Sequence, residues 1–480
     1  MELKKKVFSG IKWTTFATVN NSIVQIIKLS ILTRILDSSN FGLIAIVLMV
    51  TGFFELFSGI GLFVALLHEK DVTPQQYSSI FWVNLFIGLG LFIIVILGAP
   101  LIATFYNESI LRILLPLMGV QLLLNSFGRL FYTFKQRNLE FDFISKVNII
   151  GAYIGSIITI ILAVFDYGIY SLVYGILVQT FFIQLIYTLS GSCKYRVLFY
   201  CNISDIKSLM KIGGFQVGSQ ILDYAANKID VFLIGRFFGM ESLGIYNLAK
   251  ELIQKPVQII NPIITNVAIP AFSRIQDNII IVKDNYLKIL KVLCSINFPI
   301  FICLFIFATP ISIVLYGSTY IHVAVFIRIL SVWGILTSIV NPAAILIVSK
   351  GRTDLGFYWT IIRTSIYLIG IYCSSYFSLY WIGYSQVIMW IVFTFIYWRM
   401  IIFPLAQITL KEYMNAVISP LAITLLAGIV TPFFLFFNAI AFQLFFLVLY
   451  LITYITIYSI LNKSLLNSLW LIINNRNEKL

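Results

Sequence analysis

The sequence is poor in charged residues. Only 11% of its 480 residues are Asp, Glu, Lys or Arg, whereas 60% are hydrophobic and the mean hydropathy is +0.97. Soluble globular chains carry about 25% charged and about 45–50% apolar residues. This chain lacks the polar side chains that would cover a surface in water, so a soluble domain is excluded and a lipid-facing surface is predicted.

Residues that form disulfides or bind metals are also scarce. The five cysteines include no CxxC pair, and only Cys193 and Cys201 fall in one expected loop. The two histidines, His68 and His322, lie far apart, at the boundaries of apolar segments. This pattern predicts neither a disulfide framework nor a metal site, and no cofactor is expected.

The signatures of common enzymes are missing as well. The sequence contains no Walker lysine loop, no HExxH and no GxSxG. The longest connections between apolar segments, near 191–210 and 272–287, are too small for a catalytic domain. We therefore expect a protein that is not an enzyme, with its energy taken from an ion gradient or from consumption of its substrate on the far side.

The sequence does contain a long series of apolar windows. A membrane-spanning helix needs about 20 predominantly apolar residues. Fourteen such windows follow one another along the chain, so we predict an all-α integral membrane protein with about fourteen transmembrane helices. The windows are 12–36, 41–66, 78–104, 109–133, 143–165, 168–190, 211–237, 243–271, 288–310, 323–348, 356–376, 379–400, 412–435 and 439–461.

The basic residues indicate how these helices are oriented. Lys and Arg number 33 against 19 Asp and Glu, and they gather in alternate connections, beginning with Lys4 to Lys6 and ending with Lys463 to Lys479. The opposite connections, such as DSSN, FYNES and FDYG, carry almost none. Because cytoplasmic loops are enriched in Lys and Arg, both termini are predicted to lie in the cytoplasm. A membrane rather than a nucleic acid is therefore the expected partner of the positive charge.

One short pattern occurs twice. Residues 34–45 read RILDSSNFGLIA and residues 236–247 read RFFGMESLGIYN, an offset of 202 without a gap. The offset also aligns Asn21 with Asp223 and Lys28 with Asp230. Six windows separate the two copies, so both run in the same direction through the membrane. Two lobes related by an axis along the membrane normal are a known transporter plan, with the substrate site at their interface.

The repeat predicts the domain organisation. The N-terminal lobe is expected at 1–200 and the C-terminal lobe at 201–405, each with six helices. Two further helices follow at 406–462, and residues 463–480 form a cytoplasmic tail.

Ionisable residues inside the windows are candidate site residues. A charge near the bilayer centre costs about 2.5–3.5 kcal/mol on insertion scales, so it normally faces protein or water. We expect a water-filled central cleft whose positive excess suits an anionic solute, because Arg and Lys bind phosphate oxygens. The cleft cations are Lys28, Arg34, Lys228, Arg236, Lys250, Lys255 and Arg363. Four carboxylates have either an ion-coupling role or an internal pairing role: Glu55, Asp223, Asp230 and Glu251.

Prolines and aromatic residues add two further expectations. Pro256 and Pro262 each remove a backbone donor from the window 243–271, which favours a kink that serves as a gate or simply shapes the packing. The segment GAYIG, with Gly151 and Gly155, fits a close contact between helices. Aromatic rings suit sugar faces, and the candidates are Tyr224, Tyr246, Tyr358 and Trp359.

Several long stretches resemble the bacterial polysaccharide flippases of the multidrug/oligosaccharidyl-lipid/polysaccharide exporter superfamily. They include KKKVFSGIKWTTF, LSILTRILDSSNFGLIAIVLMVTGFFELFSGIGL, SSIFWVNLFIGLGLF and GFQVGSQILDYAANKIDVFLIGRFFGMESLGIYNLAKELIQKPVQ. The similarity is clear over roughly residues 1–275 and extends further by helix count. It is strongest to the branch that includes colanic-acid and teichuronic-acid exporters.

This resemblance implies a flippase in the bacterial cytoplasmic membrane that works by alternating access. Its substrate would be an undecaprenyl-pyrophosphate-linked oligosaccharide, moved to the outer leaflet for capsule, exopolysaccharide or O-antigen synthesis. The polysaccharide polymerase and chain-length machinery are candidate partners. In the family, the first, second, seventh and eighth helices line the central cavity, which here corresponds to Lys28, Glu55, Asp223, Lys228, Asp230, Lys250 and Lys255.

Two other functions remain open on the sequence alone. A drug/cation antiporter of the same superfamily would usually have twelve helices and an anionic cleft. A membrane polysaccharide polymerase or ligase would need an extended outer loop with catalytic residues. The fourteen windows, the positive excess and the short loops favour the flippase over both.

Overall fold

The computed structural model describes residues 2–59, 63, 66–67, 72–202, 207–428 and 440–461. The regular structure of these ranges consists of helices, and the described part of each of the fourteen windows overlaps a helix. Eight helices of the described part are long and apolar enough to cross a membrane by length and composition alone. The predicted all-α membrane fold is confirmed.

The helices form two compact units, and the first comprises Met1–Leu252, Leu315–Val323 and Phe357–Met389. Its N-terminal helices are α1 (Glu2–Leu32), α2 (Ser38–Glu55), α4 (Pro74–Tyr106), α5 (Leu111–Arg137), α6 (Phe141–Val164) and α7 (Ile169–Ser192). They are followed by the part of α8 (Lys207–Ile275) up to Leu252, by a short 3-10 turn (Ser318–Tyr320), and by most of α13 (Thr353–Ser375) and α14 (Leu379–Tyr397).

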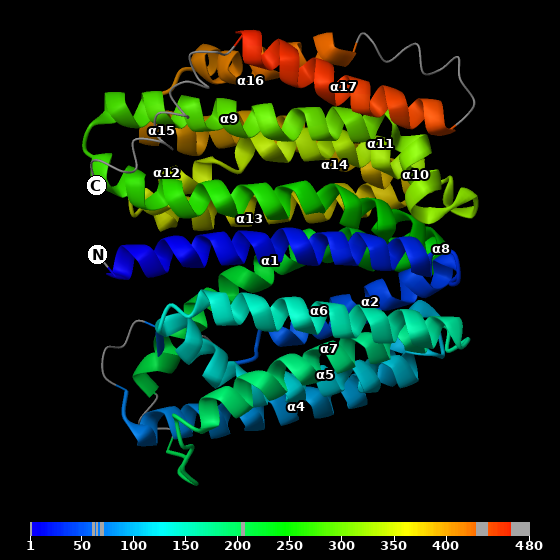
Figure 1. The fold of residues 1–480 in the computed structure, drawn as a ribbon, viewed down its shortest axis with the longest axis vertical. Coiled ribbons are helices and arrows are strands. Elements are labelled where there is room, and N and C mark those ends of the chain that lie inside the picture. The colour runs from blue at the N-terminus through cyan, green and yellow to red at the C-terminus, as the bar shows by residue number, and fades with distance from the viewer. Residues whose placement is uncertain are drawn as a thin grey trace. The chain divides into compact units, whose positions relative to one another are not determined.

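Helices α4 to α7 form a layer of neighbours in the first unit. α4 packs on α5, α5 on α7 and α7 on α6, and α6 then contacts α1 (Figure 1). Helices α6 and α7 approach each other closely at two glycines. A β-carbon on Gly155 would lie only 3.0 Å from the carbonyl oxygen of Gly175. The predicted small-residue contact at GAYIG is therefore confirmed within the chain.

The two copies of the sequence repeat contact each other reciprocally. A β-carbon on Gly42 would lie 1.9 Å from the carbonyl oxygen of Met240, and one on Gly244 would lie 1.9 Å from that of Ser38. Both pairs of equivalent positions, 42 with 244 and 38 with 240, differ by 202. The same contact is thus made twice with the roles exchanged, which is the signature of a two-fold relation. This geometry supports the parallel repeat.

The break between the seventh and eighth windows falls at Gly239. Its backbone angles, φ 79° and ψ 175°, are open to glycine and strained for other residues, and they interrupt the otherwise helical α8. Pro256, Pro262 and Pro270 lie inside the second part of this helix. The turn between the two windows therefore depends on a glycine rather than on a proline.

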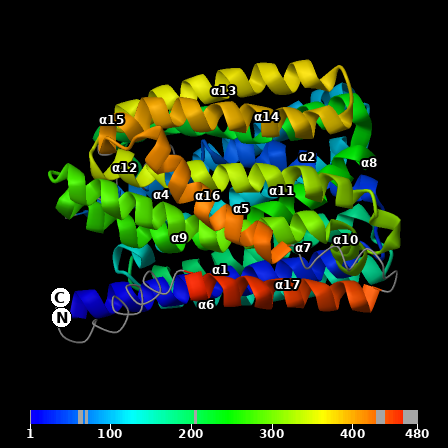
Figure 2. The same cartoon turned by 90° about the horizontal axis from the view of Figure 1, so that it is seen from above.

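Helices α13 and α14 run side by side in the first unit (Figure 2). The hydroxyl of Ser385 donates to that of Ser374 at 3.1 Å. A β-carbon on Gly370 would lie 2.4 Å from the sulfur of Met389, so the two helices approach closely there.

The second unit comprises Ile253–Val314, Ala324–Gly356 and Trp390–Leu480. It contains the end of α8, α9 (Ile279–Ile306), most of α10 (Ala308–Tyr316), nearly all of α11 (Val323–Val340), α12 (Ala343–Ser349) and the end of α14. After a π-helical turn at Trp398–Ile402 come α15 (Phe403–Ala406), α16 (Leu410–Ala427) and α17 (Ile440–Leu461). α16 crosses α9 at an angle and contacts α17 (Figure 2).

A proline inside α9 explains one bond that holds the second unit together. Pro299 has no N–H, so the carbonyl of Ser295, one turn earlier, lacks its usual partner within the helix. The hydroxyl of Tyr454 on α17 donates to that carbonyl at 2.6 Å. A neighbouring helix thus satisfies a backbone group that has no water to bind in a membrane.

Some expectations fall outside this description. His68 and the predicted cytoplasmic tail at 463–480 lie outside the described residues. The lobe boundaries at residues 200 and 405 stay a prediction.

The reciprocal contact predicts that Gly42→Ala destabilises the protein. Its methyl group would overlap the carbonyl oxygen of Met240, and such overpacking typically costs about 1–3 kcal/mol. Gly98→Ala is the matched control, because nothing lies within 4 Å of a β-carbon there and alanine is the better helix former. Thermal unfolding of purified protein in detergent should show a lower midpoint for the first variant only. Equal midpoints would show that the crossing tolerates a methyl group.

Candidate functional site

A cavity of about 290 Å³ with polar lining lies inside the first unit, and we call it the polar cavity. α1 contributes Asn21, Gln25 and Lys28, which recur at helical spacing and therefore share one face. α8 contributes Asn247 and Glu251, one turn apart. Parts of α2, α6 and α7 complete the wall.

The carboxylate of Glu251 is held by two amides. The Gln25 side chain donates to its Oε2 at 3.5 Å, and the Asn247 side chain donates to its Oε1 at 3.3 Å. Lys28 and Glu251 place one cation and one anion on the cavity wall. The buried Oδ1 of Asn21 has no hydrogen-bond partner among the described residues.

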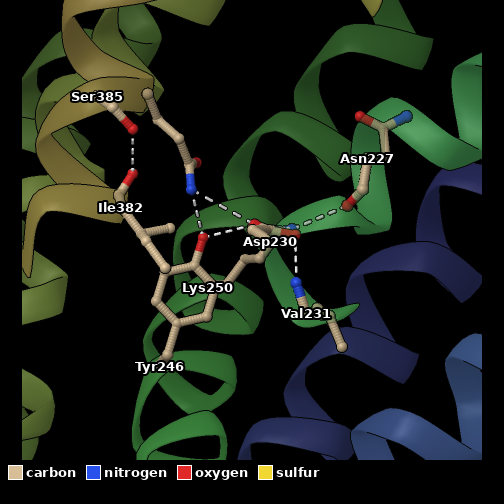
Figure 3. A network of polar contacts seen from close by, with 8 residues as sticks. Asn227, Asp230, Val231, Tyr246, Lys250, Ile382 and Ser385 are labelled. Carbon is tan, nitrogen blue, oxygen red and sulfur yellow. Dashed lines mark hydrogen bonds and ion pairs between the residues drawn. The ribbon is translucent and has the colours of Figure 1, made fainter. Parts of the chain in front are cut away.

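Asp230, Tyr246 and Lys250, which Figure 3 labels, form a second polar group together with Gln386, and we call these four residues the buried network. Lys250 Nζ lies 2.6 Å from Asp230 Oδ2 and 2.9 Å from the carbonyl oxygen of Asn227. The Tyr246 hydroxyl donates to Asp230 Oδ2 at 2.5 Å and accepts from the Gln386 amide at 2.7 Å. The backbone N–H of Val231 donates to Asp230 Oδ1 at 2.8 Å.

Complete pairing explains how two charges can be buried here. Asp230 is 1% exposed and Lys250 is 7% exposed, so neither can be solvated by bulk water. A buried ion pair is tolerated only when its attraction and additional hydrogen bonds offset the lost hydration. Of the two roles expected for Asp230, the geometry matches internal pairing.

A third polar group pairs the predicted cation Arg363 on α13 with Asp223 on α8. The guanidinium is partly shielded and the carboxylate is about half exposed. This contact brings together two predicted site residues that are 140 positions apart in the chain.

Glu55 lies at the end of α2 and is bound by an amide relay. The Asn125 side chain donates to Glu55 Oε1 at 3.1 Å, and the Gln184 side chain donates to Asn125 Oδ1 at 2.9 Å. The predicted carboxylate is therefore fixed by side chains of α5 and α7.

The remaining predicted residues are more widely distributed. Arg34 is exposed at the end of α1, where it donates to Ser30. Arg236 is exposed, and its guanidinium carbon lies 5.1 Å from the centre of the Phe105 ring. Lys255 is half-buried on α8, and Lys228 faces an apolar groove that is separate from the polar cavity.

The aromatic candidates also have different surroundings. Tyr246 is fully buried in the network, and Trp359 is 6% exposed, so neither ring is open to a sugar. The Tyr224 hydroxyl donates to the carbonyl of Met49 at 2.7 Å. Tyr358 is 59% exposed.

Reasoning from charges alone missed the amides. Asn125, Gln184, Asn247 and Gln386 all bind predicted carboxylates or their partners. Each lies within an apolar window, so counting uncharged polar residues in the windows would have found them. In the described part of the chain, no three His, Cys, Asp or Glu residues are grouped as a metal site.

Comparison with known proteins places the chain among the proteins of polysaccharide biosynthesis. The sequence model of a family described as "Polysaccharide biosynthesis protein" matches residues 31–325, more than half of the chain. The Teichuronic acid biosynthesis protein TuaB of Bacillus subtilis (strain 168) is 28% identical over 434 residues, which cover 89% of each chain. The Lipopolysaccharide biosynthesis protein WzxC of Escherichia coli (strain K12) is 26% identical over 368 residues, covering 77% of this chain and 75% of WzxC.

A solved structure shares the fold. The lipid II flippase MurJ in its inward closed conformation superposes with a TM-score of 0.76 at 15% identity, covering 96% of this chain and 100% of the MurJ chain. Together with the family match, this confirms the resemblance found in the sequence.

The buried network predicts a strong, partner-dependent effect of Lys250→Met. Removing the ammonium group leaves the Asp230 carboxylate buried without its cation, which typically costs about 3–5 kcal/mol. The double variant Asp230→Leu/Lys250→Met removes both charges and should recover much of this loss. Thermal unfolding in detergent measures both effects, with Arg352→Met, which breaks an exposed pair with Asp354, as the control with little change. A double variant less stable than the single one would contradict a simple pairing role.

Proposed function

We propose a transport function for this chain, which belongs to the polysaccharide biosynthesis protein family. It is a flippase that carries a polyprenyl-pyrophosphate-linked oligosaccharide from the cytoplasmic to the outer leaflet by alternating access. The observation that carries this proposal is the polar cavity, where Lys28, Glu251 and four amide side chains (Asn21, Gln25, Gln179 and Asn247) line a space inside a membrane protein.

The polar head group of such a substrate matches the polar cavity, and its prenyl tail matches the surrounding lipid. A pyrophosphate and its sugars are too polar to cross hydrocarbon, because they would lose their hydrogen bonds to water. Amides, a lysine and a carboxylate can replace those bonds, and Lys28 adds a cation for phosphate oxygens. The prenyl tail is apolar, so it can stay in the hydrocarbon of the membrane without such partners.

The printed names of the relatives support the class of product. TuaB is named for teichuronic acid biosynthesis and WzxC for lipopolysaccharide biosynthesis, and both polymers contain saccharides. The fold shared with MurJ is compatible with this proposal. We extend the saccharide class to this chain without specifying its sugars.

The proposal includes a location, an orientation and moving parts. The chain would lie in the bacterial cytoplasmic membrane with both termini in the cytoplasm, as the alternation of basic connections predicts. The lobes at 1–200 and 201–405 would rock against each other, with Pro256 and Pro262 at the gate. The polymerase and chain-length machinery would receive the product outside.

Depletion of the protein provides the direct test. Lipid-linked saccharides would be extracted and scored by leaflet with an impermeant reagent that modifies sugars. Accumulation of complete, protected repeat units with loss of surface polymer would support the flippase. Single units in the outer leaflet would instead indicate a polymerase or ligase, and unchanged pools would favour the drug/cation antiporter.

Lys28→Gln tests the role of the cavity cation. Glutamine keeps a polar side chain, one atom shorter than lysine, but removes the charge that would bind phosphate, so surface polysaccharide should fall at least tenfold at an unchanged protein level. Lys28→Arg retains the charge and should keep a substantial part of the export. Normal export in Lys28→Gln would remove this lysine from the substrate site.

A further inference from the structure

A separate groove of about 660 Å³ lies between α2, α4 and α8 in the first unit, and we call it the apolar groove. Each helix contributes residues at the same spacing, so three helix faces meet along it. α2 contributes Met49, Val50, Phe53 and Phe54; α4 contributes Leu101, Ile102, Phe105 and Tyr106; α8 contributes Tyr224, Ala225, Lys228, Ile229 and Phe232.

The groove is apolar with one charged exception. The hydroxyls of Tyr224 and Tyr106 are bound to the carbonyls of Met49 and Phe232, which leaves Lys228 as the ionic group of the lining. No ion pair of the described residues includes Lys228. The groove therefore combines a long hydrocarbon surface with one ammonium group.

The edges of the groove are open. Leu101 is 73% exposed, and Phe53, Phe105 and Phe232 are 37–40% exposed. The volume lies within the range of about 300–1,000 Å³ that is typical of ligand sites. An occupant could thus place one part of a chain in the groove while the rest stays outside.

The position of Lys228 distinguishes a carried lipid from an ordinary membrane lipid. Lys228 lies eleven residues before the break at Gly239, which corresponds to about 16 Å along the helix. This is close to half the thickness of a hydrocarbon core of about 30 Å. The phosphate of a resident phospholipid lies at the membrane surface, whereas a lipid in transit brings its phosphate to this depth.

We propose that the apolar groove seats the first isoprene units of the transported lipid while Lys228 binds its phosphate. The inference rests on the proposed function and adds a binding site for the tail. Lys228 lies on the same helix as Asn247 and Glu251 of the polar cavity, on the other side of the break at Gly239. Arg236, two turns further along the same stripe, offers a second cation toward the end of the helix.

The test uses undecaprenyl phosphate with a diazirine near its phosphate, added to the purified full-length protein in phosphatidylcholine nanodiscs. Peptide mapping of the unmodified protein should place the cross-links in residues 49–54, 101–106 and 224–232. A diazirine-labelled phosphatidylglycerol is the comparison probe and should label these peptides at least fivefold less. Because this map needs no variant, misfolding cannot hide the result.

Matched variants then test the groove itself. Ile102→Trp fills it, and Leu97→Trp places the same side chain on the same helix outside the lining, at a position 70% exposed. Labelling should fall at least fivefold in Ile102→Trp and in Lys228→Gln, and stay near the unmodified level in Leu97→Trp and Lys228→Arg.

Contrary outcomes separate this inference from the proposed function. Cross-links outside the groove, full labelling of Ile102→Trp or equal labelling by phosphatidylglycerol would overturn the tail site, while the depletion result would still support a flippase. Absence of specific labelling together with unchanged lipid-linked pools on depletion would overturn both.

Discussion

The ion pair between Asp230 and Lys250 is the interaction on which the arrangement of α8 depends. The glycine break at residue 239 lies between them, so the pair joins the two halves of an interrupted helix. Gln386 adds α14 to the same point through the hydroxyl of Tyr246. In a membrane these groups find no water, and the protein must supply every partner. The two halves of α8 are therefore held at a fixed position relative to each other by these buried polar contacts.

The fixed arrangement of the two halves of α8 positions two different environments, the polar cavity and the apolar groove. With the second half of α8 held in place, Asn247 and Glu251 face the amides of α1 across the polar cavity. On the first half, Tyr224, Lys228 and Phe232 face the apolar side chains of α2 and α4. A substrate with a polar head and an apolar tail needs both environments, and the buried network keeps them on adjacent parts of one helix. The reciprocal contact of Gly42 and Gly244 adds a second fixed point, because it brings α2 against α8.

Much of the fold could be predicted from local properties. Apolar windows must become helices in lipid, because only then are their backbone groups satisfied within each segment. The repeat was visible because the glycine and arginine positions coincide at one offset. The candidate site was only partly predictable. Charges such as Lys28 and Glu251 were found because they are costly in a membrane, whereas Asn125 and Gln386 were missed because an amide in an apolar window is less conspicuous.

The sequence by itself determined the all-helical membrane architecture, the positions of its windows and the set of charges inside them, because these follow from transfer energies that each segment pays independently. Tertiary structure alone decided which of those charges are paired. Lys28, Lys228 and Lys250 have the same side chain, yet one lines a polar cavity, one faces an apolar groove and one is buried on Asp230. The reason is that pairing depends on distances between helices, and the helices that meet at Asp230 come from positions 156 residues apart.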